Sequence, residues 1–195
     1  MIKVAPHFLE QQYFTGQVLI ATPQIIDSRF SHSVVLICGH DHNGAMGLIL
    51  NQLIDELTFK DLVGQLSIQP SDALNTNIPV HFGGPIEMGR GFVLHSTDYL
   101  HETSIRISDE IALTSTLEIL NLLAQGKGPK EKILALGYAG WGAGQLEMEL
   151  QKNSWLQMEA DPDLVFSRDL SETWQKALKK MGVDAALLSS QTGHA

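Results

Sequence analysis

The stretch that decides the fold runs from Ser33 to Asn51 and reads SVVLICGHDHNGAMGLILN. Its first part, residues 33–40, is a nearly continuous run of β-branched and aliphatic side chains, which predicts a strand buried on both faces. The pair Asn43-Gly44 is typical of a type I′ turn, because both central positions of that turn need positive φ. Residues 45–51 are therefore expected to return as the antiparallel partner of 33–40.

Further strands and helices are expected on both sides of this hairpin. Short aliphatic or β-branched runs predict strands at 18–21, 80–82, 92–95, 104–107, 110–113, 132–138, 155–158 and 164–166. Apolar residues at helical spacing, with capping residues before them, predict helices after Thr58, after Ser115, over 145–151 and after Asp169. Hairpins first and helices later favour an α/β fold of the α+β type, with a mixed, mostly antiparallel sheet and flanking helices. A doubly wound sheet stays open as the alternative.

Composition narrows the class of protein. A chain of 195 residues with 44% hydrophobic residues can form one domain, here residues 1–195, with a sizeable core. The 22 acids outnumber the 13 Lys and Arg, and the formal net charge of -9 disfavours direct nucleic-acid binding and anionic membranes. The single cysteine, Cys38, lies in an apolar run, which fits a buried thiol in a reducing compartment. With no apolar segment of about 20 residues, no membrane association and a cytoplasmic location are expected.

A glycine-rich segment, Gly137-Tyr138-Ala139-Gly140-Trp141-Gly142-Ala143-Gly144, lies between a predicted strand and a predicted helix. Backbone amides in that position can bind phosphate. The dinucleotide fingerprint G-x-G-x-x-G fails in both registers, because Gln145 and Glu147 stand where glycine is needed. Tight-turn packing is the plain interpretation, and a small neutral or cationic ligand stacking on Trp141 is the functional one.

A second glycine cluster, His81-Phe82-Gly83-Gly84-Pro85, leads through Arg90 to a further predicted strand. The plain interpretation is a corner of the sheet. In the functional interpretation, Gly83 and Gly84 expose backbone amides, and the Arg90 guanidinium binds a carboxylate or phosphate.

Polar residues gather around the hairpin, where His40 and His42 are two residues apart. Such spacing can seat a metal on a strand, but the Asn-Gly turn interrupts the strand and no cysteine adjoins it. Neither a metal site nor a cofactor is expected. Motifs of serine hydrolases, zinc proteases and P-loop enzymes are absent from the sequence, so no catalytic residue is assigned.

The chain resembles one known family, the AlgH/YqgE-like proteins of bacteria. The segments that carry the resemblance, in order, are Gly16–Pro23 with Asp27 and Phe30, His40–Asn51, Gly83–Pro85 with Gly91–His95, and Gly137–Trp141 with Gly144–Glu147. The resemblance implies a compact α/β fold around a barrel-like, mainly antiparallel sheet in a cytosolic protein. The family name suggests transcriptional regulation of exopolysaccharide synthesis, and the resemblance supplies no catalytic residue.

Together these patterns predict a non-enzymatic binding or regulatory module that acts indirectly, through an unknown protein partner or a small-molecule effector. The alternative is an enzyme acting on a small polar or anionic metabolite, with Arg90 orienting the substrate and a His or Glu as acid or base. Exposed apolar faces of short sheets often pair, which leaves a homodimer open. The candidate binding surface consists of His40, Asn43, Asn51, Gly83, Gly84, Arg90, Trp141 and Gln145.

Overall fold

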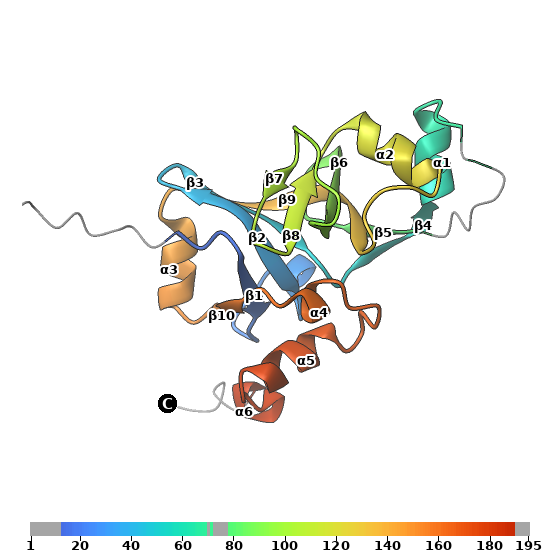
Figure 1. The fold of residues 1–195 in the computed structure, drawn as a ribbon. Helices are drawn as coiled ribbons and strands as arrows, with labels where there is room; N and C mark the ends of the chain where they lie inside the picture. The colour runs from blue at the N-terminus through green and yellow to red at the C-terminus, as the bar shows by residue number, and fades with distance from the viewer. Residues whose placement is uncertain (1–12, 70, 72–77, 190–195) are drawn as a thin grey trace, which may run out of the picture.

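A computed structural model describes residues 13–69, 71 and 78–189 of the chain, and within them a curled sheet carries helices on its outside (Figure 1). The strands are β1 Gln17–Ala21, β2 Val34–Asp41, β3 Gly44–Ile49, β4 Leu53–Thr58, β5 Pro79–Phe82, β6 Ile86–Ser96, β7 Ile105–Arg106, β8 Ile111–Thr114, β9 Lys132–Gly142 and β10 Trp155–Glu159. The helices are α1 Phe59–Gln65, α2 Leu117–Ala124, α3 Gln145–Gln151, α4 Pro162–Val165, α5 Thr173–Lys180 and α6 Ala185–Ser189, with a 3-10 turn at Ser28–Phe30.

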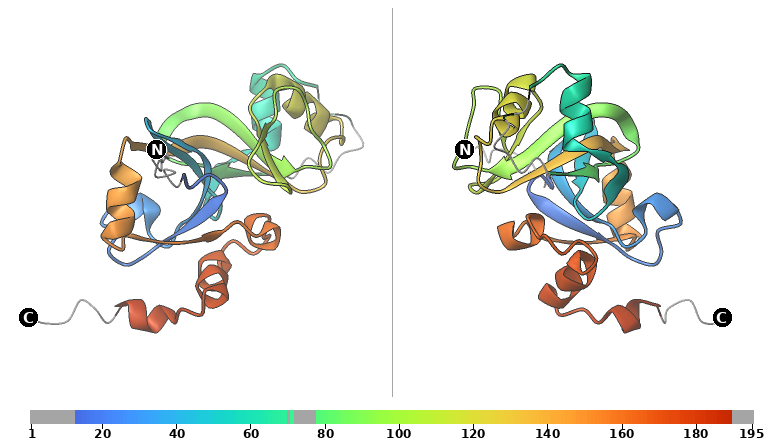
Figure 2. Two further views of the ribbon diagram at one scale, coloured as in Figure 1. Left: turned by 60° about the vertical axis from the view of Figure 1, so that its left-hand side comes forward. Right: turned by 90° about the vertical axis from the view of Figure 1, so that its right-hand side faces the viewer.

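The sheet is mixed and mostly antiparallel, as predicted. Its strands follow the order β10-β1-β2-β3-β9-β6-β8-β7, with β5 joined to β9 and β4 to β5. Among the described strands only the β5–β9 pair is parallel, which rules out the doubly wound alternative. The sheet curls into a half-barrel rather than lying flat (Figure 2).

Strand β9 pairs with strands in both halves of this sheet. Its first part, residues 132–136, pairs with β6, and its last part, residues 139–142, pairs with β3. Between the two parts lies Gly137, whose φ of 70° bends the strand. A side chain at Gly137 would collide with the backbone of the turn between β5 and β6, because its Cβ would lie 2.3 Å from the Gly84 carbonyl oxygen. The glycine therefore lets one strand serve both halves of the sheet.

The predicted hairpin is confirmed, since β2 and β3 pair antiparallel down to Asp41 and Gly44. The predicted turn is wrong by one residue. His42 and Asn43 form the loop, and Asn43 is not among the described residues with positive φ, whereas Gly44 has φ of 142°. The Asp41 carboxylate accepts the Asn43 backbone N–H at 2.7 Å, an Asx turn that removes the need for positive φ at Asn43.

Three apolar clusters form the core. One lies under α1 and α2, a second joins α3 to the hairpin and β10, and a third joins β1, β2 and β6 to α4 and α5. The third cluster is closed by Trp174 of α5, whose indole N–H donates to the Ala21 carbonyl at 2.8 Å. The clusters place α1 with α2 at one end of the sheet and α3 at the other (Figure 1).

Helix α1 begins at the predicted capping box, in which Thr58 and Asp61 satisfy each other's backbone N–H groups. The predicted capping box at Ser115 is wrong, because Thr116 is the N-cap of α2 and makes no side-chain cap hydrogen bond. The predicted strand at 164–166 is also wrong. Asp161 caps the helix α4, and Pro162 fits its first turn, where no backbone N–H is needed.

Candidate functional site

Most of the glycine-rich segment around Trp141 belongs to strand β9 rather than to the connection between strand and helix. Strand β9 continues to Gly142, so only Ala143 and Gly144 connect it to α3. Gly144 has φ of 72°, a left-handed conformation that glycine adopts without strain, and it starts α3 directly. The strand predicted at 132–138 is therefore too short, because pairing with β3 extends β9 by four residues, 139–142.

The Glu149 carboxylate, on α3, accepts hydrogen bonds from three side-chain N–H groups. Its Oε2 accepts the indole N–H of Trp141 at 2.9 Å and that of Trp155 at 2.8 Å. Its Oε1 accepts the side-chain amide of Gln145 at 2.9 Å. Within the described part of the chain, Glu149 forms no ion pair with a lysine or arginine. A carboxylate is thus held among aromatic rings by neutral donors alone.

This network faces a pocket of about 350 Å³, called here the Trp141 pocket. The rings of Trp141 and Trp155 meet edge to face with centroids 6.0 Å apart, and Phe30 meets Trp155 in the same way at 5.9 Å. The side chain of Ile26, which also lines the pocket, is 99% exposed. The lining residues are Gln24, Ile25, Ile26, Asp27, Phe30, Gly140, Trp141, Gln145, Glu149, Lys152, Ser154 and Trp155.

His40 lies on the other side of Trp141, beside the hairpin turn. Its ring stacks on Phe14 with centroids 5.3 Å apart, and its Nδ1 accepts the Phe14 backbone N–H at 3.0 Å. The proton therefore sits on Nε2, which lies 3.1 Å from the Glu147 carboxylate. His40, Asn43 and Trp141 line one open hollow. The His40 side chain itself is 1% exposed, so it mainly joins α3 to the hairpin.

The structure brings together four of the eight candidate residues, His40, Asn43, Trp141 and Gln145, at the α3 end of the sheet. Asn51 lies at the opposite end of the hairpin from His40, where its side chain accepts the Val34 N–H at 2.8 Å and donates to the His32 carbonyl at 2.9 Å.

The other candidates belong to a crossing between β5, β6 and β9. A Cβ on Gly83 would lie 2.3 Å from the Gly137 carbonyl oxygen, and one on Gly84 would lie 2.1 Å from the Tyr138 carbonyl carbon. The Gly83 N–H donates to the Leu136 carbonyl at 2.8 Å, so this amide is already engaged. Arg90 pairs with Glu87 at 3.2 Å and lies over the Phe92 ring. Close backbone contact thus accounts for both glycines.

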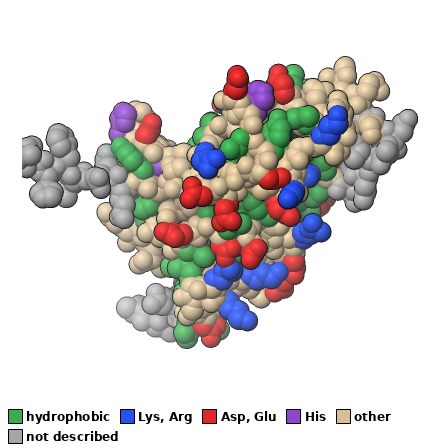
Figure 3. Space-filling model, viewed as in Figure 1, with side chains coloured by type: hydrophobic (Ala, Val, Ile, Leu, Met, Phe, Trp, Pro, Cys, Tyr) green, Lys and Arg blue, Asp and Glu red, His purple; other side chains and the backbone are tan. Residues whose placement is uncertain are grey.

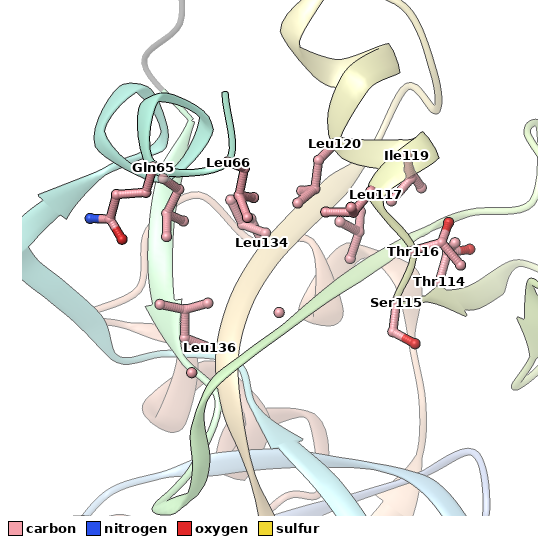
Figure 4. Close-up of a pocket in the computed structure, with 14 residues that line it drawn as sticks. Gln65, Leu66, Thr114, Ser115, Thr116, Leu117, Ile119, Leu120, Leu134 and Leu136 are labelled. Carbon is pink, nitrogen blue, oxygen red and sulfur yellow. The ribbon is translucent and has the colours of Figure 1, made fainter. Parts of the chain in front are cut away.

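A second pocket lies between α1 and α2 and was missed by sequence reasoning (Figure 4). It is called here the leucine pocket. Leu117 is 55% exposed and lines this pocket together with Leu120, which also packs against the core. The available signal was the pair Gly89 and Gly91, which also line it. Glycines at alternate positions of a strand are unusual and often mark a site of close approach.

Two histidines and the cysteine are buried and line neither of these two pockets. Burial lowers the pKa of His81 and His95 below the ordinary value, and each donates from Nδ1 to a backbone carbonyl. His95 Nε2 also meets the Thr114 hydroxyl at 2.8 Å. Burial raises the pKa of the Cys38 thiol to about 12, so Cys38 is not a thiolate nucleophile at neutral pH.

Charges and metal-binding side chains are scattered. Acidic and basic side chains intermingle on the face in Figure 3, without a continuous basic area there. Among the residues with described positions, no three His, Cys, Asp or Glu side chains gather as metal ligands do. No helix in the described ranges is long and apolar enough to span a membrane.

Comparisons with known proteins agree on one family. A family model described as AlgH-like matches residues 18–186. A UPF0301 protein of Rhodospirillum rubrum is 47% identical over 94% of this chain and 95% of its own length, and one of Cereibacter sphaeroides is 48% identical over 93% and 98%.

Solved structures agree with the sequence relatives. The solution structure of the AlgH protein of Pseudomonas aeruginosa has a TM-score of 0.77 and 35% identity over the full length of both chains. The crystal structure of the Corynebacterium diphtheriae protein DIP2367, at 19% identity and a TM-score of 0.70 over 97% of this chain and 95% of that one, shows the same fold. The chain therefore belongs to the AlgH-like family.

Proposed function

We propose that this protein is a non-enzymatic binding module that holds a small organic cation in the Trp141 pocket and acts as a regulator through a protein partner. The observation that carries the proposal is the Glu149 carboxylate, held by two indole N–H groups and one amide without a cation of its own. Of the eight candidate surface residues, Trp141 and Gln145 line this pocket, and His40 and Asn43 line the neighbouring hollow. The proposal leaves out Asn51, Gly83, Gly84 and Arg90.

The proposed cation site rests on the charge of Glu149 and on the size and aromatic lining of the Trp141 pocket. An aromatic ring attracts a cation through its negative face, and a nearby carboxylate adds to that attraction. The pocket volume of about 350 Å³ is at the lower end of the range for small-molecule sites, roughly 300 to 1,000 Å³. Asp27 at the rim is already paired with Arg29 at 2.6 Å, so Glu149 is the carboxylate left for a ligand.

The regulatory part of the proposal rests on the family and on charge. A formal net charge of -9 disfavours direct contact with nucleic acid, so an effect on gene expression would pass through another protein. A buried, unpaired cysteine fits a reducing compartment, and we place the protein in the cytoplasm. The rival enzyme hypothesis relies on Arg90, which is exposed and paired with Glu87.

The test compares a cation with its neutral isostere. Calorimetric titration with choline should show saturable binding, whereas 3,3-dimethylbutan-1-ol, which has the same shape without charge, should bind at least about tenfold more weakly. The Glu149→Gln variant should lose most of that difference. Equal affinity for the two probes, or no binding of either, would overturn the proposal of a cation site.

A matched control removes one acid elsewhere. Glu56, on β4, is exposed and lies outside the Trp141 pocket. The Glu56→Gln variant has the same change in net charge as Glu149→Gln and should bind choline like the unmodified protein. A similar loss in both variants would attribute the effect to overall charge rather than to the pocket.

A further inference from the structure

The leucine pocket has a volume of about 240 Å³ and is separate from the Trp141 pocket, with which it shares no residue. Figure 4 shows its two sides, with Leu66 coming from α1 and Leu117 and Leu120 coming from α2. Strand β9 lies between the helices below them. The aliphatic walls are Leu62, Leu66, Leu117, Leu120, Leu134 and Leu136.

Two positions on the floor of this pocket lack side chains. Residues 89, 91 and 93 of β6 all line it, as alternate residues on one face of a strand do. Val93 fills its position, but the next two positions are glycine. A Cβ on Gly89 would meet nothing within 4 Å, and one on Gly91 would meet only Leu136 Cδ2, at 3.8 Å.

Gly89 lies in the part of β6 where the pairing with β9 is irregular, so a bulge accounts for one of the two glycines and leaves the other, Gly91, unexplained. Both have φ outside the left-handed region, and neither is close to another backbone. Glycine inside a strand is less favourable than alanine, because glycine loses more chain entropy on folding. A strand interior that keeps glycine under these conditions is typical of a site that a ligand approaches closely. The absence of side chains at these positions of the pocket floor therefore indicates space for a ligand.

Charge and size restrict that occupant. No lining residue is charged, and the polar ones are Gln65, Thr114, Ser115 and Thr116. An ion would lose its hydration without gaining an opposite charge, so the complementary ligand is uncharged. A volume of about 240 Å³ holds about eight groups of the size of a water molecule, at roughly 30 Å³ each. One turn of an α-helix, about 10 Å across and about 5.4 Å long, needs more space than this volume.

We propose that the leucine pocket binds a small uncharged molecule with an aliphatic chain. The chain lies over Gly89 and Gly91 between the leucines of α1 and α2. The polar end of the molecule lies at Gln65 or Ser115, which line the same pocket. This site is independent of the proposed cation site and would stand if that site failed.

The test uses linear alcohols as probes. Titration of the protein with 1-butanol through 1-decanol, followed by the methyl resonances of Leu66 and Leu117, should show saturable binding. Affinity should rise about fourfold per added methylene and level off near eight carbons, when the pocket is full. Octanoate should bind at least about tenfold more weakly than 1-octanol. An affinity that rises without a limit, or equal binding of octanoate, would overturn the proposal.

A variant that fills the floor of the leucine pocket tests whether the alcohol binds there. Gly91→Val places a β-branched side chain in the pocket at a position with space and ordinary φ, so the protein should stay folded and lose 1-octanol binding at least about tenfold. The control is Gly64→Ala on α1, which also has no neighbour within 4 Å but lies outside the pocket. Gly64→Ala should bind 1-octanol unchanged.

Two outcomes would contradict this assignment. If folded Gly91→Val binds 1-octanol unchanged, the alcohol binds elsewhere. If an extended peptide binds along β6 and no alcohol binds, the site takes an added peptide strand rather than a small ligand. If Gly91→Val lowers the unfolding midpoint, Leu117→Asn gives the same test, because this side chain is 55% exposed and its loss leaves the core intact.

Discussion

Two glycine pairs within nine residues of each other have opposite surroundings. Gly83 and Gly84 are pressed against the backbone of β9, where a Cβ would lie 2.1 to 2.3 Å from main-chain atoms. Gly89 and Gly91 face an open pocket and have no close backbone neighbour. In sequence the two pairs look alike. Glycine is therefore informative about function only after its contacts in the folded chain are known, because close packing accounts for the first pair and not for the second.

The largest effect is expected at the crowded pair. Gly84 has φ of 151°, and a Cβ there would overlap the Tyr138–Ala139 peptide. Gly84→Ala should lower the free energy of unfolding by about 3 kcal/mol or more, since backbone strain and overpacking both act. Urea unfolding measures the change. A loss below about 1 kcal/mol would mean that β5 and β9 can separate without penalty, and the comparison of the two pairs would fail.

A smaller effect is expected from the buried histidines that flank the two pairs, His81 and His95. Burial lowers both pKa values in the folded state, so the unfolded state binds more protons just below its own pKa of about 6.5. Stability from this source is complete above pH 6.5 and decreases as the pH falls toward the folded-state values. Urea midpoints should therefore be lower at pH 5.5 than at pH 7.5.

The His81→Asn variant separates this effect from that of the carboxylates. The asparagine side chain could still donate to the Leu50 carbonyl, which His81 contacts at 2.8 Å, but it cannot titrate. The decrease between pH 7.5 and pH 5.5 should become smaller in this variant. A decrease of the original size would assign the pH dependence to other groups.

The smallest effect, and one of opposite sign, is expected at the open pair. Gly89→Ala should raise the free energy of unfolding by about 0.5 to 1 kcal/mol, because alanine loses less chain entropy on folding and has space at this position. Gly84→Ala measured in the same urea series is the comparison. Destabilisation by Gly89→Ala would show that the β6 backbone needs glycine for its own conformation and would weaken the inference of an occupant.

Local signals predicted those elements whose residues are neighbours in the chain. The hairpin around Asn43-Gly44, the capping box of Thr58 and Asp61, and the helix at 145–151 all appear in the structure. Strand β4 was not predicted, because Asp55 and Glu56 interrupt its apolar pattern and it is held by pairing with β5. The apolar run at 164–166 fitted a strand or a helix, and the Asp161-Pro162 cap favoured the helix.

The candidate site was predicted only in part, for the same physical reason. Trp141 and Gln145 were singled out by a motif continuous in sequence, but Glu149 and Trp155 were not. Trp155 reaches Trp141 because β10 pairs with β1, and Glu149 was one of two similar acids on α3. Neither relation has a short-range sequence signal.

By itself, the sequence determined the family, the acidic charge, the central hairpin and the capped start of α1, because each depends on composition or on residues close together in the chain. Only the tertiary structure decided that β9 joins both halves of the sheet, that Glu149 receives two indole N–H groups, and that Gly91 faces a pocket while Gly84 faces a backbone. Those features depend on contacts between distant segments, and such contacts form only when all the strands of the sheet have paired.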